Sequence, residues 1–356
     1  MVITGQIAAS VGENNVALHN VFMYNKFLFL SGIIVFTVAC SYGQQLFQRA
    51  TYPMRVIFDT DFGPDYDDVG AITLLHSFAD SGYVQILATV ASSGHKNVAA
   101  AINVFNTYFN RPEVPIGVVR KGAVNLGDKQ HWTDSVINRF PHRINNNQDA
   151  PDALTLYREL LSAQPDHSVT IITVGFLTNL ANLLESAGDQ YSSLNGYELV
   201  KKKVINLISM AGRFPSGYEF NLAQDVRSTK KVLSEWPTSI LFSGFEIGQK
   251  IKTGIPLMHN HDIQRSPVKD VFAICIPMAK EDSAGRMSRD ETAVFVAIKG
   301  WRDYYELETG KCSIDEKGFN TWKHDGNSQA HLIEKMSPDQ ITLIINNLLM
   351  HQPMSK

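Results

Sequence analysis

The stretch Asp59-Thr60-Asp61-Phe62-Gly63-Pro64-Asp65-Tyr66-Asp67-Asp68 places five carboxylates within ten residues. It follows the apolar run MRVIF at 54–58, which is typical of a buried strand, and precedes a helical pattern over 69–80. Five acids at the end of a strand resist ionising together unless a cation or a shared proton relieves their repulsion. The stretch therefore predicts a polar site at a strand-to-helix turn.

The residue types around this turn indicate which cation the site would take. Carboxylate oxygens are hard donors that select Ca²⁺ or Mg²⁺, and the absence of Cys and His from the stretch argues against zinc. Gly63 and Pro64 favour a tight turn, so Asp61 at the strand end can face the same point as Asp67 and Asp68. The amino terminus of the helix also favours negative charge. A solvated acidic loop is the alternative, and the position between a strand and a helix argues against it.

From residue 54 onward, short apolar runs alternate with amphipathic stretches, and this alternation decides the fold class. Strands alternating with helices predict an α/β fold: a single domain with a mainly parallel, Rossmann-like central sheet flanked by helices. Functional groups in such sheets collect at the carboxyl ends of the strands. The stretch from Gly122 to Pro151 has weak periodicity and is predicted to be a long loop. Further strands are expected at 84–90, 114–119, 168–174, 202–210 and 238–244, with helices at 96–110 and 176–186.

Composition excludes several classes of protein. The 356 residues carry 32 Lys+Arg and 35 Asp+Glu, a formal charge of −3, which gives no case for nucleic acid or an anionic membrane surface as a partner. With 44% hydrophobic and 19% charged residues, the chain is neither disordered nor a polytopic membrane protein. Its three cysteines, Cys40, Cys275 and Cys312, are too scattered for a disulfide framework or a zinc site.

The amino-terminal segment has the layout of an export signal. Lys26 is followed by the apolar run FLFLSGIIVFTVA at 27–39, which is too short to span a bilayer, since a span takes about 20 residues. A basic residue, an apolar run and then small residues are typical of a bacterial secretory signal. A buried core helix is the alternative, but the run has polar flanks and no amphipathic period.

These features predict how the chain is divided. Met23 would make a better start than Met1, so 1–22 is expected to be an upstream extension, 23–44 a signal peptide and 52–350 the folded domain. The protein is expected to be exported, periplasmic or extracellular, with no stable membrane span. Val38-Ala39-Cys40 also resembles a lipoprotein box, so a lipid anchor on Cys40 stays open as an alternative to cleavage.

Two known families carry Asp-x-Asp after a strand, and neither fits well. Haloacid-dehalogenase-type phosphatases use the first Asp as nucleophile, here Asp59, but they would want Thr or Val soon after the second, where this chain has Phe62 and Gly63. The EF-hand loop requires acids at alternate positions, a following Gly and a distal Glu inside a helical pair.

The chain resembles the nucleoside hydrolase family, whose opening motif is DTDxG followed by DDxxAI. This sequence has DTDFG at 59–63 and DDVGAI at 67–72, separated by a short insertion. Further similarities follow in the family's order, and five together carry more weight than any one alone. They are RPEVPIGV at 111–118, VGFLTNLANLL at 174–184, MAG at 210–212, EFN at 219–221 and DETAV at 290–294.

The resemblance implies calcium-dependent hydrolysis of the N-glycosidic bond of a ribonucleoside or a related N-glycoside, releasing base and ribose. It implies Asp67 as the general base that takes the proton of the attacking water, although the insertion leaves Asp65 open for that place. It also implies Ca²⁺ as the cofactor, a small-molecule nucleoside as the substrate and a homo-oligomer, dimer or tetramer. The implied metal ligands are Asp61, Asp68, Asp290 and the backbone carbonyl of Val174.

Residues that would contact the substrate are implied in the same way. Glu219 and Asn221 resemble the family's ribose-binding pair, with capping of a helix start as the alternative for both, and Met210 stands in the segment that corresponds to the family's MGG. Asp59 is expected to orient the loop or hydrogen-bond a metal ligand.

Several positions depart from the family pattern. An Asn usually follows the second strand, and Ser93 or His95 would have to substitute for it here. Arg289 replaces the His that often precedes the late Asp, and Arg213 stands where an Asn is expected, so an anionic or otherwise different substrate stays open. His131 and Trp132 are candidates for base stacking or leaving-group protonation, with ordinary loop packing as their alternative. A non-catalytic, calcium-dependent sugar or nucleoside binder is the main competing hypothesis.

Overall fold

The computed structural model describes Phe47 and residues 52–354, which belong to one compact unit. The expected upstream extension at 1–22, the signal peptide at 23–44 and Cys40 lie outside the described residues. Within the described part of the chain, no helix combines the length and the apolar character needed to cross a membrane.

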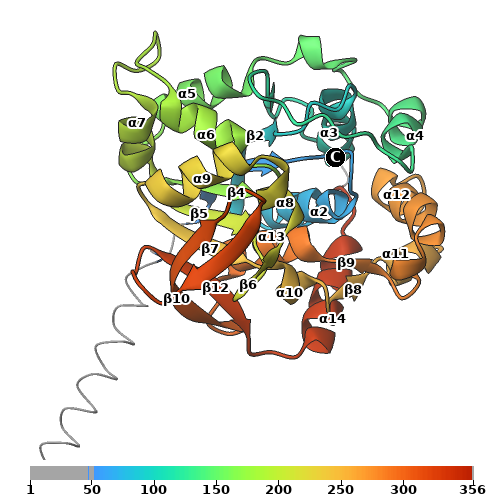
Figure 1. Ribbon diagram of the computed structural model, residues 1–356. Helices are drawn as coiled ribbons and strands as arrows, with labels where there is room; N and C mark the ends of the chain where they lie inside the picture. The colour runs from blue at the N-terminus through green and yellow to red at the C-terminus, as the bar shows by residue number, and fades with distance from the viewer. Residues whose placement is uncertain (1–46, 48–51, 355–356) are drawn as a thin grey trace, which may run out of the picture. The chain divides into compact units, whose positions relative to one another are not determined.

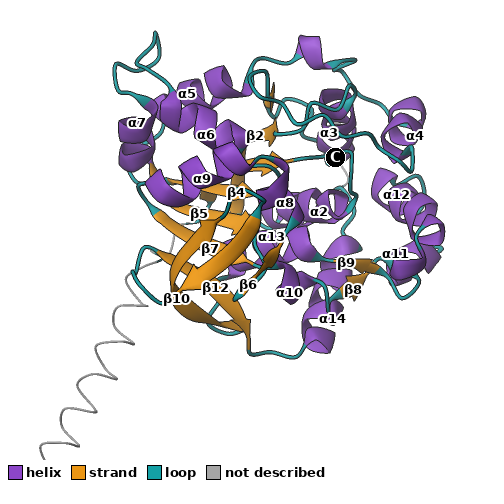
Figure 2. Ribbon diagram, viewed as in Figure 1, coloured by secondary structure: helices purple, strands orange, loops and turns teal. Residues whose placement is uncertain are grey.

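A ten-stranded sheet forms the centre of the molecule, in the order β3-β2-β1-β4-β5-β7-β12-β10-β11-β6 (Figure 2). Within this sheet, as described, neighbouring strands pair in parallel from β3 through β2, β1, β4, β5 and β7 to β12. From β12 to β10, β11 and β6 at one edge, neighbours pair antiparallel. The large, mainly parallel sheet predicted from the sequence is therefore confirmed. The strands are β1 (Met54–Thr60), β2 (Val84–Ala91), β3 (Ile116–Val118), β4 (Val169–Thr173), β5 (Val204–Met210), β6 (Ser216–Tyr218), β7 (Ser239–Ser243), β10 (Tyr305–Ile314), β11 (Phe319–Lys323) and β12 (Gln329–Glu334), with a separate pair β8 (Lys252–Thr253) and β9 (Arg286–Met287).

Helices flank the sheet on both sides, as expected for parallel strands (Figure 1). One face packs against α5, α6, α7 and α9 through a single large apolar cluster, and the other packs against α2 and α13. The helices are α2 (Asp67–Asp80), α3 (Val98–Tyr108), α4 (Trp132–Arg139), α5 (Ala153–Ala163), α6 (Thr178–Glu185), α7 (Gly196–Lys203), α8 (Phe220–Gln224), α9 (Val226–Glu235), α10 (Phe245–Gly248), α11 (Ile255–His259), α12 (Pro267–Cys275), α13 (Arg289–Lys299) and α14 (Pro338–Leu349), with short 3₁₀ turns at Asn147–Asp149, Ile276–Met278 and Lys280–Asp282.

One sequence-based prediction about the fold was wrong. The stretch from Gly122 to Pro151 is not one long loop, because it contains α4 and the 3₁₀ turn Asn147–Asp149. The buried residues of α4 are Trp132, Thr133 and Val136. Three buried positions in a helix of eight residues make too short a pattern to predict a helix from the sequence.

The histidine on α2 gives the fold a testable pH dependence. His76 is fully buried, with its Nε2 3.0 Å from Asn106 Oδ1 and its ring stacked on Phe109 at 4.8 Å. Burial lowers the pKa of His76 from 6.5 to about 3. The unfolded chain therefore takes up a proton as the pH falls below 6.5, whereas the folded chain does not until about pH 3. The stabilising contribution of the neutral ring is complete above the higher value and is lost as the pH falls toward the lower one.

We expect His76→Gln, which keeps a donor for Asn106, to remove this dependence. Between pH 7 and pH 5 the native protein should lose roughly 2 kcal/mol of unfolding free energy relative to the variant, since each pH unit below the unfolded pKa contributes about 1.4 kcal/mol. Denaturant unfolding at both pH values measures the difference. Equal losses in the two proteins would contradict a neutral buried His76.

Candidate active site

The site lies where the strand order reverses, beyond the carboxyl ends of β1 and β4. The chain leaves β1 toward β2 on one side, while β4 lies on the other, which is the position at which open α/β sheets bind ligands. Asp61 follows the last residue of β1, Val174 follows β4, and Met210 ends β5. The sequence therefore brings side chains from three strand ends to one edge of the sheet.

Gly175 allows the β1 and β4 loops to approach each other closely. A Cβ at this position would lie 2.4 Å from the backbone nitrogen of Asp61 and 2.5 Å from Ser92 Oγ. Contacts this short do not occur between real atoms, so any larger residue would push the Asp61 loop away from Val174.

We expect Gly175→Ala to destabilise the fold by about 1–3 kcal/mol, the usual cost of overpacking, and to displace Asp61, which would weaken the binding of any cation that Asp61 helps to hold. Thermal unfolding and calorimetric titration with calcium measure the two effects. Gly127→Ala is the matched control, because a Cβ there meets nothing within 4 Å. Unchanged calcium affinity in the Gly175 variant would show that Asp61 is not a ligand fixed by this contact.

Three carboxylates converge where the amino termini of α2 and α13 meet. Asp67 and Asp68 begin α2 and Asp290 lies in the first turn of α13, and one oxygen from each lies within 4.8 Å of the others. All three are buried. Burial and then the neighbouring Asp67 raise the pKa of Asp68 to about 8, and the same causes raise the pKa of Asp290 well above its usual range.

This cluster has the properties of a cation site. Thr60 donates its hydroxyl to Oδ1 of Asp68, whereas Oδ2 of Asp68 is buried without a hydrogen-bond partner among the described residues. Asp61 is also buried, and its pKa is raised well above its usual range by burial and by repulsion from Asp68. Hard oxygen donors with unrelieved negative charge fit Ca²⁺ or Mg²⁺.

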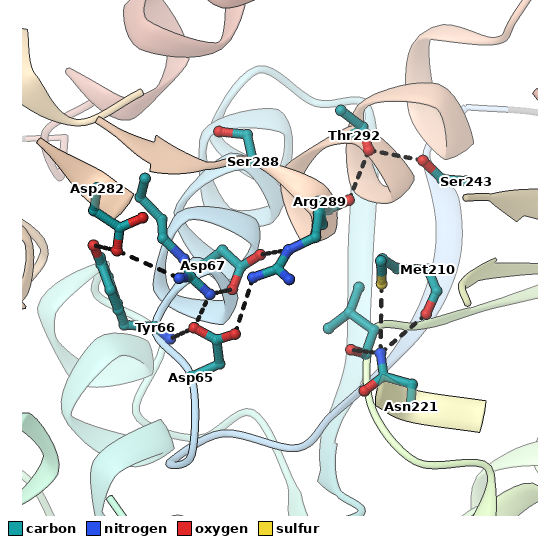
Figure 3. Close-up of polar contacts among 12 residues, drawn as sticks. Asp65, Tyr66, Asp67, Met210, Asn221, Ser243, Asp282, Ser288, Arg289 and Thr292 are labelled. Carbon is teal, nitrogen blue, oxygen red and sulfur yellow. Dashed lines mark hydrogen bonds and ion pairs between the residues drawn. The ribbon is translucent and has the colours of Figure 1, made fainter. Parts of the chain in front are cut away.

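Two arginines compensate part of this charge. Arg286 donates through Nη2 to Oδ1 of Asp67 at 2.9 Å and to Asp65, and Arg289 donates through Nε to Oδ2 of Asp67 at 3.3 Å and through Nη2 to Asp65 at 3.0 Å. Asp65 and Asp67 thus share both guanidinium groups, and the close-up shows Asp65, Asp67 and Arg289 facing one another (Figure 3). Burial and then Arg289 lower the pKa of Arg286 to about 9.

A further carboxylate fixes the position of Arg286. Tyr66 donates its hydroxyl to Asp282 at 2.6 Å, Asp282 accepts from Arg286 at 3.4 Å, and the guanidinium lies 4.6 Å from the centre of the Tyr66 ring (Figure 3). This network ties the Pro64–Tyr66 insertion to the segment just before α13.

A cavity of about 180 Å³ opens beside the cluster. It brings together most of the residues that the sequence analysis assigned to the metal, to the base and to the sugar. Its lining residues are Asp61, Pro64, Asp65, Asp67, Val174, Met210, Glu219, Phe220, Asn221, Arg289 and Asp290.

Comparison with known proteins identifies the family. Residues 56–341 match the family described as inosine-uridine preferring nucleoside hydrolase. The chain belongs to this family. Membership makes the protein an N-glycosyl hydrolase, and its aspartate cluster offers ligands for the metal on which the family depends.

Solved nucleoside hydrolases share the fold at low sequence identity. A plant nucleoside hydrolase is 16% identical with a TM-score of 0.64, over 84% of this chain and 99% of that chain. The inosine-uridine preferring enzyme from Bacillus anthracis is 15% identical with a TM-score of 0.64 (83% and 99%), and the purine-preferring ribonucleoside hydrolase from Gardnerella vaginalis is 14% identical with a TM-score of 0.66 (83% and 99%). Comparison with curated protein sequences gave no significant match.

In this nucleoside hydrolase, Glu219 and Asn221 line the cavity and also hold the local backbone. The two oxygens of Glu219 accept three backbone N–H groups, from Gly212 at 3.0 Å, Asn221 at 2.9 Å and Leu222 at 3.1 Å. The Asn221 amide donates to the carbonyl of Val174 at 2.8 Å and to that of Met210 at 3.1 Å. Helix capping by Glu219 is therefore observed, and Asn221 holds the Val174 carbonyl in place.

Other residues of the nucleoside hydrolase that the sequence nominated do not line this cavity. Ser93 is buried and accepts a hydrogen bond from the backbone of His95, whose Nε2 lies 3.1 Å from Thr133 Oγ1. His131 is exposed on the surface, and Trp132 is fully buried with its ring 5.1 Å from that of Phe62. The aromatic residue that does line the cavity is Phe220, which the sequence analysis did not select.

Asp59 and Arg213 also lie outside the cavity lining of the nucleoside hydrolase. Asp59 is fully buried and accepts hydrogen bonds from Tyr157 at 2.8 Å and Asn179 at 3.1 Å, and burial raises its pKa to about 7. It braces the end of β1, while Thr60 makes the contact with Asp68. The guanidinium of Arg213 lies 4.2 Å from the centre of the Phe245 ring.

Proposed function

We propose that the protein is a calcium-dependent N-ribohydrolase that cleaves the N-glycosidic bond of a ribonucleoside and releases base and ribose. The observation that carries this proposal is the convergence of Asp67, Asp68 and Asp290 beside a cavity that Asp67, Asp290 and Asn221 line. Family membership supplies the reaction class, and the chemistry of the donors favours calcium.

The residues divide between holding the ion and handling the proton. Asp61, Asp68, Asp290 and the carbonyl of Val174 would hold the ion, whose positive charge would lower the pKa of water and orient sugar hydroxyls. Asp67 would then take the proton of the attacking water. Burial raises the pKa of Asp67 and Arg289 opposes that rise, so the carboxylate is a stronger base than an exposed aspartate.

The sugar would be positioned by side chains that are themselves fixed. Because the Asn221 amide donates to two backbone carbonyls and lies 3.5 Å from Met210 Sδ, its side-chain orientation is set before the substrate arrives. Among the described residues, none donates a hydrogen bond to its side-chain carbonyl oxygen, which is therefore available to a sugar hydroxyl. Preorganised contacts of this kind lower the entropic cost of holding the reacting carbon near the water.

Two competing functions are not favoured. A phosphatase would use Asp59 as nucleophile, but that carboxylate is fully buried, bonded to Tyr157 and Asn179 and outside the cavity lining. A non-catalytic sugar or nucleoside binder would need no general base, whereas Asp67 lies beside the ion cluster in the place where a base is required.

A substrate panel tests the proposal. The purified protein would be incubated with inosine, uridine, adenosine and guanosine, with calcium or with a chelator, and ribose release scored as reducing sugar. Calcium-dependent release from any N-riboside supports the proposal. Binding of ribose or nucleoside without turnover in calcium would instead establish the binder.

Export and self-association are part of the same proposal and rest on the sequence and the family resemblance. The segment at 23–44 would direct the protein out of the cytoplasm, and the mature enzyme would form a dimer or tetramer. Cell fractionation, mass spectrometry of the mature amino terminus and the Cys40→Ser variant distinguish cleavage from lipid anchoring. Light scattering measures the assembly, and a cytoplasmic, uncleaved monomer would contradict both parts.

A further inference from the structure

The cavity wall offers no side chain suited to protonating a leaving base. Among the described residues that line it there is no His, Lys, Cys or Tyr. Arg289 occupies the wall, but a guanidinium does not give up its proton at any ordinary pH. A base that must be protonated as it departs, such as hypoxanthine or uracil, would find no general acid there.

The carboxyl groups of the wall that are not assigned to the ion or to the water are also unsuited to this task. Asp65 accepts hydrogen bonds from Arg286 and from Arg289. The two oxygens of Glu219 accept three backbone N–H groups. Both carboxyl groups are thus already engaged as acceptors by neighbouring donors in the wall.

The charge around the cavity favours a cation. Five of the lining residues are acidic, Asp61, Asp65, Asp67, Glu219 and Asp290, and one, Arg289, is basic. The acidic residues of the wall therefore outnumber the basic one, and a divalent cation bound there would offset part of that excess. An anionic substrate would be repelled, and both arginines that reach Asp67 are already engaged by carboxylates.

An open aromatic face completes the arrangement. Phe220 lines the cavity and is 41% exposed, and its ring centre lies 5.8 Å from that of Phe176. An aromatic face attracts a cation that lies over it. A flat, positively charged heterocycle is therefore matched by both the ring and the acids.

We infer that this enzyme acts on N-ribosides whose leaving heterocycle already carries a positive charge, such as pyridinium ribosides. This inference rests on the proposed N-ribohydrolase function. The C1′–N bond breaks with both electrons going to nitrogen, so the heterocycle departs neutral and needs no proton. Water forms the new C1′–O bond, and its proton passes to Asp67 and then to solvent.

Three probes test the inference with the full protein in calcium. They are N-ribosylpyridinium, the neutral 4-nitrophenyl β-D-riboside, whose leaving group also departs unprotonated, and inosine, which requires a proton. Each kcat/KM is divided by the rate of uncatalysed hydrolysis of the same compound. We expect the normalised value for the pyridinium riboside to exceed that for inosine, because charge and ring then favour the cation, whereas a wall that held a general acid would favour inosine by about 100-fold. It should also exceed that for the nitrophenyl riboside, by a margin that shrinks as salt is added.

Two kinds of variant distinguish the effect of the missing proton donor from the effect of selection for a positive charge. Arg289→His places a proton donor on the wall and should narrow the ratio of pyridinium riboside to inosine, whereas Arg289→Gln, which carries no donor of that kind, should not raise inosine turnover. Phe220→Leu should lower the preference for the cation over the nitrophenyl riboside roughly two- to fivefold.

The outcomes are distinguishable. Normalised turnover of inosine equal to that of the pyridinium riboside overturns the inference and leaves the N-ribohydrolase standing. A nitrophenyl riboside cleaved as well as the cation at every salt concentration overturns the selection for charge. No release of ribose from any probe overturns the proposed function itself.

Discussion

Replacing Asp67 with asparagine is expected to lower kcat by about 10³-fold, in the middle of the range for loss of a general base. Asparagine keeps the shape of the side chain and still offers one acceptor to Arg286 or Arg289, but it takes no proton from water. The effect should appear in kcat and kcat/KM alike, because the interaction is made in the transition state. Steady-state assays with the best substrate of the panel measure both constants.

Asp65→Asn is the matched control. Its side chain is 31% exposed and pairs with the same two arginines, whereas that of Asp67 is 3% exposed and lies among the ion ligands. The structure therefore favours Asp67 for the role that the sequence left open between the two. A loss for Asp65→Asn as large as that for Asp67→Asn, with calcium affinity unchanged in both, would move the base to Asp65.

Removing the divalent cation is expected to abolish turnover and to lower thermal stability. Without the ion, four buried carboxylates at Asp61, Asp67, Asp68 and Asp290 lose the charge that balances them. An ion present at 100 times its dissociation constant stabilises the folded state by about 2.7 kcal/mol. For a domain of about 300 residues that corresponds to a fall in Tm of roughly 4 °C on chelation. Activity and calorimetric melting are measured with chelator, and again after calcium is restored.

Asp290→Asn should reproduce the chelated state. We expect it to lose activity in the presence of calcium and to show little further change in Tm when chelator is added. Asp262→Asn, which removes an exposed acid, is the control and should respond to calcium like the native protein. Full activity of the native enzyme after exhaustive chelation would rule out a catalytic role for a divalent ion.

The sequence predicted the strands and the convergence of the acids well because both depend on local pattern. MRVIF followed by DTDFG specifies a buried strand and an acidic turn within fifteen residues, Met54–Asp68, and the late Asp290 was found by its place in an ordered set of motifs. Strands and the starts of helices can be predicted from short stretches of sequence. These parts of the site were therefore within reach of the sequence.

The basic residues that pair with those acids could not be predicted from the sequence. The sequence showed that the acids need a counter-charge, yet the counter-charge comes partly from Arg286 and Arg289, which reach Asp67 across 219 and 222 residues. The sequence signal for this pairing was the presence of two arginines, Arg286 and Arg289, just before Asp290. Ser93 and His95 were nominated by alignment with a motif, but their side chains bond within their own loop region, and only the tertiary structure could reveal this.

The packing of α2 against α13 decides when the site can exist during synthesis of the chain. The acids at 65–68 belong to the first strand–helix unit, and the residues that neutralise and complete them begin at 286. Closing a loop of more than 200 residues is unfavourable until the intervening sheet has formed. A nascent or truncated chain that ends before 286 therefore carries the acidic motif without the rest of the site, so binding of the metal would be a measure of complete folding.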